Sequence, residues 1–290
     1  MENYNQQYGY GAQPTITLTH SVSKVMRSVY MRMFLGLLVT AGVAIYVAAS
    51  PAIMSAIFSS RLTFWGLIIA EFACVIAITG AINKLSTFAA TSLFFLYAVL
   101  NGVVFSSIFW AFELGSIAYT FAITAGVFGA MSIYGYLTSN DLTKMGSFLF
   151  MALIGLIITT IVNIFVGSST LEWLISFAGV AIFIGLTAWD TQKIKQMVQY
   201  SDSSQVGKIA TIGALTLYLD FINLFLYMLR FFGNSRNYAT DIQKHKRPPQ
   251  ELSRRRAFAL EACGGLPLRF LLLRKSNYRD KDWWFWQKIG

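Results

Sequence analysis

The sequence has few charged residues and few of the side chains on which most enzyme sites depend. Only 12% of its 290 residues are charged, about half the fraction of a soluble globular domain, so too little polar surface remains to cover a water-soluble fold. The two histidines, His20 and His245, lie outside the apolar stretches, where they are poorly placed for a metal site or a triad. The two cysteines, Cys74 and Cys263, cannot form a disulfide framework. These shortages favour a membrane protein without enzymatic activity.

Apolar runs are abundant, and 56% of the residues are hydrophobic. A helix needs about 20 mostly apolar residues to cross a bilayer, and short polar connections between such runs favour antiparallel neighbours in one bundle. We therefore expect an all-α membrane protein, a bundle of seven transmembrane helices within residues 31–237, after a polar cytoplasmic segment at 1–30. The seven runs are residues 33–49, 64–82, 87–109, 116–137, 146–166, 173–189 and 209–231.

Lysine and arginine in the loops predict the orientation. Eight of them lie in the N-terminal segment and the even-numbered loops, whereas the odd-numbered loops contain only Arg61, which places the N-terminus in the cytoplasm. Seven crossings would leave the C-terminus outside, yet Arg230 and Arg236 lie at the end of the last run and just after it. Either the last segment is a re-entrant element that returns to the cytoplasmic side, or earlier helices determine the topology.

The net charge of +10 belongs mostly to the C-terminal tail. Residues 1–237 contain 11 basic and 8 acidic residues, a balance of +3, whereas residues 238–290 contain 12 and 5, a balance of +7. The membrane part is thus nearly neutral, and we expect no nucleic-acid partner. The tail has no run long enough for an eighth span. We interpret it as disordered or non-native extra sequence, with a basic and aromatic arm for anionic lipid headgroups as the alternative.

Three acids lie where charge is expensive, within or at the margin of the apolar runs: Glu71, Asp190 and Asp220. Burying a charged acid at mid-bilayer costs about 2.5 to 3.5 kcal/mol, so it needs a partner, a proton or water. Asn223 follows Asp220 on the same helical face and predicts a polar stripe toward the bundle interior. At 1.5 Å per residue, Asp220 is about 18 Å deep and Asp190 about 7 Å, a difference that tilt or a wet cavity would close.

A meeting of Asp190 and Asp220 would create a pH sensor. Two like charges in a low dielectric cannot both ionise near neutral pH, so the pair would share a proton and join two helices. After losing that proton the acids repel, and their oxygens become hard ligands that suit calcium. We therefore expect Asp190 and Asp220 to gate an ion path and to contact calcium, with Glu71 and Asn223 along the path or supporting it. A purely structural, hydrogen-bonded Glu71 is an equal alternative.

Several segments resemble the bacterial branch of the Bax inhibitor (transmembrane Bax inhibitor motif) family. The similarity covers about residues 22–236 in order. It is carried by residues 131–138 (MSIYGYLT), 185–194 (GLTAWDTQKI), 217–225 (LYLDFINLF) and 229–233 (LRFFG). The resemblance implies a multi-pass protein of the bacterial inner membrane in which six helices surround a semi-polar last helix. It also implies a pH-sensitive calcium leak gated by the acids at positions 190 and 220, with the bilayer and calcium as partners and no cofactor.

Other functions fit the sequence less well. Some bacterial relatives are associated with modulation of a membrane-bound protease, which would make the chain a regulatory binding protein without an ion path. An intramembrane aspartyl protease also needs two acids that share a proton, but neither Asp190 nor Asp220 lies in a Gly-x-Gly-Asp setting. A proton-coupled transporter predicts inverted repeats with broken helices, and the sequence has no convincing internal repeat.

Overall fold

The structure is a computed structural model, and it describes residues 15–82, 84–201 and 204–234. Throughout this part the regular secondary structure is helical, which confirms the predicted all-α class. The helices are α1 (Thr15–Ala49), α2 (Pro51–Phe58), α3 (Arg61–Gly80), α4 (Thr87–Phe105), α5 (Ile108–Ala111), α6 (Leu114–Leu137), α7 (Thr143–Val166), α8 (Ser169–Gln199) and α9 (Val206–Phe232).

Six segments of the described chain are long and apolar enough to cross a membrane. They contain α1, α4 with α5, α6, α7, α8 and α9. The second predicted run, residues 64–82, corresponds to α3, and its apolar part Trp65–Gly80 is shorter than the other spans. Length and composition thus support six of the seven predicted crossings.

Local capping explains two differences from the expected boundaries. The connection after the first run is itself the short helix α2, because the Ser50 hydroxyl accepts a hydrogen bond from the Ile53 amide and Pro51 occupies the first turn. At the other end, α1 begins at Thr15 and buries Val22 and Val25 in the core. The helical bundle therefore extends into the segment assigned to the polar N-terminus.

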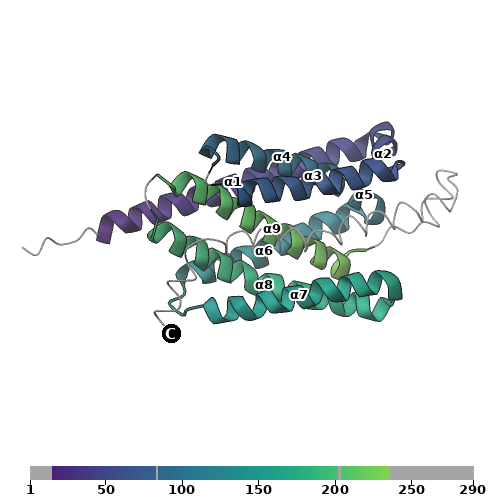
Figure 1. The fold of residues 1–290 in the computed structure, drawn as a ribbon. Helices are drawn as coiled ribbons and strands as arrows, with labels where there is room; N and C mark the ends of the chain where they lie inside the picture. The colour runs from purple at the N-terminus through teal and green to yellow at the C-terminus, as the bar shows by residue number, and fades with distance from the viewer. Residues whose placement is uncertain (1–14, 83, 202–203, 235–290) are drawn as a thin grey trace, which may run out of the picture.

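The last helix is the centre of the bundle. In its most apolar window, 94% of the residues of α9 are buried, compared with 22–44% for the other candidate spans. It packs directly against α1, α4, α6 and α8, while α7 packs on α8 and α3 on α4. Figure 1 shows α9 running diagonally between the group of α1 to α4 and the group of α6 to α8. It is one continuous helix of 27 residues, about 40 Å long, so the re-entrant alternative for this segment is wrong.

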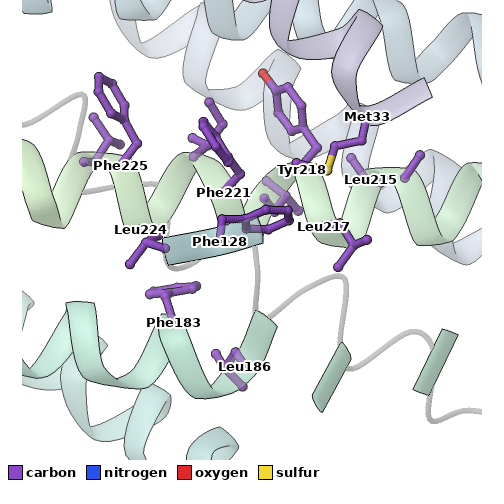
Figure 2. Packing of buried hydrophobic residues seen from close by; sticks show 14 of the residues in the cluster. Met33, Phe128, Phe183, Leu186, Leu215, Leu217, Tyr218, Phe221, Leu224 and Phe225 are labelled. Carbon is purple, nitrogen blue, oxygen red and sulfur yellow. The ribbon is translucent and has the colours of Figure 1, made fainter. Parts of the chain in front are cut away.

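Aromatic rings fill the space around α9. The rings of Phe128 on α6 and Phe221 on α9 are 5.4 Å apart, and those of Phe94 on α4 and Tyr218 on α9 are 5.7 Å apart. Figure 2 shows Phe183 of α8 beneath Leu224 on the opposite side of α9 from Tyr218. Side chains of α9 thus contact protein on several sides of the helix.

Glycines bring α8 close to its neighbours. A Cβ atom at Gly135 of α6 would overlap the Ala188 carbonyl, and one at Gly146 of α7 would overlap the Trp189 ring. At Gly179 of α8, a Cβ atom would lie 2.6 Å from the Tyr227 ring of α9. Because backbones can approach only where side chains are small, these positions determine how closely α6, α7 and α9 surround α8.

We predict that Gly146→Ala destabilises the protein by about 1 to 3 kcal/mol, because the new methyl group displaces the Trp189 ring from a packed site. Thermal unfolding in detergent checks this. Gly155→Ala is the matched control, since it lies on the same helix with open space around its Cβ position. Equal melting temperatures for the two variants would contradict the close-packing role of Gly146.

Candidate functional site

Asp190 and Asp220 are both buried and lie on two helices that pack against each other. Asp190 on α8 is 3% exposed and Asp220 on α9 is fully buried. Neither side chain faces lipid or bulk water, so each depends on the protein interior for stabilisation. The structure therefore places the two acids predicted as the gate on facing elements.

The register of α8 and α9 can be read from neighbouring contacts. The rings of Phe183 and Tyr227 are 5.8 Å apart. Asp190 lies seven residues after Phe183, and Asp220 lies seven residues before Tyr227. Seven residues are almost two full helical turns, so in this antiparallel pair both acids lie on the contact faces and at the same level. The difference in depth estimated from sequence thus disappears.

A second contact supports this register farther along the pair. A Cβ atom at Gly213 of α9 would lie 3.0 Å from Cγ2 of Ile194 on α8. Ile194 is one turn beyond Asp190, and Gly213 is two turns before Asp220. The acids are therefore bracketed by close contacts on both sides.

Asn223 and Glu71, the two other predicted site residues, are also buried. Asn223 is 1% exposed, and its Nδ2 donates to the Leu219 carbonyl at 2.7 Å, one turn earlier. Its Oδ1 accepts no hydrogen bond within the described residues and is oriented as a bare oxygen in the interior. Glu71 is fully buried on α3, which packs against α2 and α4. Glu71 thus belongs to a different layer from Asp190.

Gln192 and Lys195 connect the outer side of α8 to the α6–α7 connection. The Gln192 side chain accepts from the Leu142 amide at 2.9 Å and donates to the Asn140 carbonyl at 2.8 Å. Lys195 Nζ donates to the Tyr136 carbonyl at 2.8 Å, at the end of α6. Sequence reasoning missed Gln192, because nothing in a single sequence indicates which backbone groups an amide side chain will meet.

Arg32 connects α9 to α1 on the opposite side of the bundle. One guanidinium nitrogen donates to the Gly207 carbonyl at 2.9 Å and to the Thr211 hydroxyl at 2.6 Å. Thr211 is also within 3.1 Å of the Thr91 hydroxyl on α4. The sequence offered a signal for this contact, since Arg32 lies at the margin of an apolar run, but the residue was used only for orientation.

Asp141 is an acid of the same connection with a different environment. It is exposed, and its carboxylate accepts hydrogen bonds from the Thr143 amide at 2.9 Å and hydroxyl at 2.6 Å. These bonds favour the charged form and lower the pKa of Asp141 below its ordinary value. Asp141 therefore stays ionised near neutral pH.

The described residues contain no group of three or more His, Cys, Asp or Glu side chains that could hold a metal ion. What the site offers is a pair of buried carboxylates with the Asn223 oxygen one turn away. Such oxygens suit a hard cation as a transported ion.

These features define a multi-pass helical membrane protein with two buried acids on facing helices. The sequence model described as "Inhibitor of apoptosis-promoting Bax1" matches residues 22–237. The chain therefore belongs to the Bax inhibitor family, as the sequence motifs predicted. The match ends before the tail at 238–290, which also lies outside the described residues.

Bacterial relatives align with most of their own length. The chain is 51% identical over 214 residues to inner membrane protein YbhL of Escherichia coli, covering 73% of this chain and 92% of the relative. It is 49% identical over 217 residues to a protein of Borreliella burgdorferi, covering 74% and 94%. A Rickettsia prowazekii protein is 44% identical over 224 residues, covering 76% and 94%. The family and the apolar helices together make the chain an integral inner membrane protein.

We predict that Arg32→Met lowers the stability of the protein by about 1.5 to 3 kcal/mol, because two charged hydrogen bonds to α9 are lost. The measurement is thermal unfolding in detergent. Arg27→Met is the matched control, since Arg27 is exposed on the same helix. A melting temperature of Arg32→Met no lower than that of the control would rule out a stabilising role for Arg32.

Proposed function

We propose that the protein is a pH-sensitive calcium leak of the inner membrane, gated by a proton shared between Asp190 and Asp220. The observation that carries the proposal is the register of α8 and α9, which sets two buried acids level on facing helices. Two carboxylates in such a place cannot both remain charged without a proton or a cation between them.

In this mechanism the proton decides whether the two helices stay together. At low pH the shared proton lets Asp190 and Asp220 hydrogen-bond, which closes the path. As pH rises the proton leaves, the charges repel, and the freed oxygens can coordinate a passing calcium ion. Asn223 supplies a further buried oxygen one turn along α9. Glu71 is a candidate for the more distant part of the path.

We also propose that α3 is a seventh crossing. Helices α1 and α4 run parallel, because Gly36 lies against Phe94 and, farther along both helices, Thr40 Oγ1 donates to the Ala98 carbonyl. The chain between two parallel helices must return across the same distance. Helix α3 has 20 residues, about 30 Å, which matches a hydrocarbon core.

The N-terminus is proposed to lie in the cytoplasm. One end of the bundle collects the start of α1, the α6–α7 connection and the α8–α9 connection, as Figure 1 shows. Basic residues cluster in these segments, including Arg27, Lys144, Lys193 and Lys208. Because basic loops stay inside, this end is assigned to the cytoplasmic side.

We predict that calcium entry into liposomes containing residues 1–237 rises as pH increases from 5 to 8, by about tenfold if one coupled proton controls opening. Asp190→Asn and Asp220→Asn should each flatten this profile, because an amide cannot ionise. Asp141→Asn is the matched control. Its wild-type carboxylate has a lowered pKa and does not titrate in this interval.

Calcium entry no higher than in empty liposomes at every pH would refute the leak. A role as a regulatory partner of a membrane-bound protease would then be the better explanation. In that case the exposed loops would matter and Asp220→Asn would be tolerated.

A further inference from the structure

Polar contacts connect the first half of α9 to α1 and α4. Arg32 donates to the Gly207 carbonyl and the Thr211 hydroxyl. One helical face farther, the hydroxyls of Thr40 and Tyr218 are 2.6 Å apart. The beginning of α9 is therefore fastened to α1 and α4, and we call these three elements the first unit.

A separate set of contacts holds the end of α8 that carries Asp190. Gln192 binds the α6–α7 connection through two hydrogen bonds, and Lys195 binds the end of α6. The close approaches of Gly135 to Ala188 and Gly146 to Trp189 fasten the same stretch to α6 and α7. We call α6, α7 and α8 the second unit.

The two units meet along a line that contains both aspartates. Beside the acids, the contact consists of apolar surfaces, with Ile194 of α8 against Gly213 of α9 and Val29 of α1 also near Gly213. Smooth apolar surfaces can separate without leaving hydrogen-bonding groups unpaired. We call this line the seam.

At the opposite end of the molecule, α9 is fastened to the second unit instead. The Glu113 amide donates to the Asn234 carbonyl at 3.3 Å, and Asn234 Nδ2 donates to Glu113 Oε2 at 3.4 Å. The Asn234 amide donates to the Ser116 hydroxyl at 2.8 Å. The rings of Phe121 and Phe225 are 5.9 Å apart. Figure 1 shows the corresponding diagonal course of α9 from one group of helices to the other.

From this distribution we propose that the path opens by separation of the two units along the seam, at the end where α8 connects to α9, while the contact of Glu113 with Asn234 acts as the pivot. The inference rests on the proposed leak and adds which helices move. A hinge is expected where the fastening changes sides, because packed groups move as bodies and deform little internally.

A disulfide across the seam tests the proposal. The Cβ position of Gly213 lies 3.0 Å from Ile194 Cγ2, so the two Cβ atoms are within about 4.5 Å, a distance that a disulfide accepts. Ile194→Cys with Gly213→Cys, in a background of Cys74→Ala and Cys263→Ser, is reconstituted in liposomes. Oxidation should lower calcium entry by about tenfold or more, because the open population is removed, and a reducing agent should restore it.

The matched control pair joins α9 to α4 inside the first unit and at the same end of the molecule. The Cβ position of Gly207 is 3.4 Å from the Thr87 Cβ atom, so Thr87→Cys with Gly207→Cys also suits a disulfide. Its oxidation should change calcium entry by less than about twofold, because this contact stays closed in both states. Unchanged entry after complete oxidation of the seam pair would overturn the proposal.

Distances between spin labels test the motion without reference to calcium. Labels at Arg27 and Gln199 lie on α1 and α8, one in each unit, whereas labels at Leu137 and Gln199 both lie in the second unit; all three residues are exposed. The first pair should give a broad or two-peaked distribution that narrows when the seam disulfide forms, and the second pair a narrow one. A single narrow distribution for both pairs would overturn the seam. If reduced protein passes no calcium while the first distribution is broad, the leak fails and the motion stands.

Discussion

The rest of the structure depends on the need to enclose a helix that carries a carboxylate at mid-membrane. Asp220 lies in the centre of α9 and is fully buried, because an exposed charge in hydrocarbon would cost several kcal/mol. Enclosure requires other helices on every side, and α1, α4, α6 and α8 supply it. The lipid-facing surface is left to the outer helices, and the apolar window of α7 is only 22% buried. The order of the layers thus follows from one acidic residue.

Enclosing α9 creates a second requirement, because the buried polar groups must be reached by matching groups on other helices. At one end Arg32 binds the α9 backbone, and at the other Asn234 binds α6. Between these ends the contacts of α9 with α8 are ring and aliphatic contacts beside the aspartates. A strong acid pair within a smooth interface is a place where a single proton has a large effect on helix association, since few other polar interactions compete with it.

The sequence predicted the helical class, the apolar spans and the two acids, because these depend on composition and on the cost of charge in a bilayer. It did not predict α2 or the early start of α1, since caps and tertiary burial determine these ends. Gln192 and Arg32 were missed as contact residues because their partners are backbone groups far away in sequence. A single sequence records the donor in such a bond and leaves the acceptor unidentified.

The level of Asp190 was misjudged for an instructive reason. Lys195 was treated as marking the water boundary, yet its ammonium group donates to the Tyr136 carbonyl and α8 continues to Gln199. A lysine bound to a helix end lies at the depth of that helix end, whatever the distance to bulk water. What determines the meeting of the acids is the register of α8 on α9, held by Gly179 against Tyr227 and by Gly213 against Ile194. A slip of one residue would rotate each acid by about 100° and separate them, so these glycine contacts are as necessary to the pair as the aspartates.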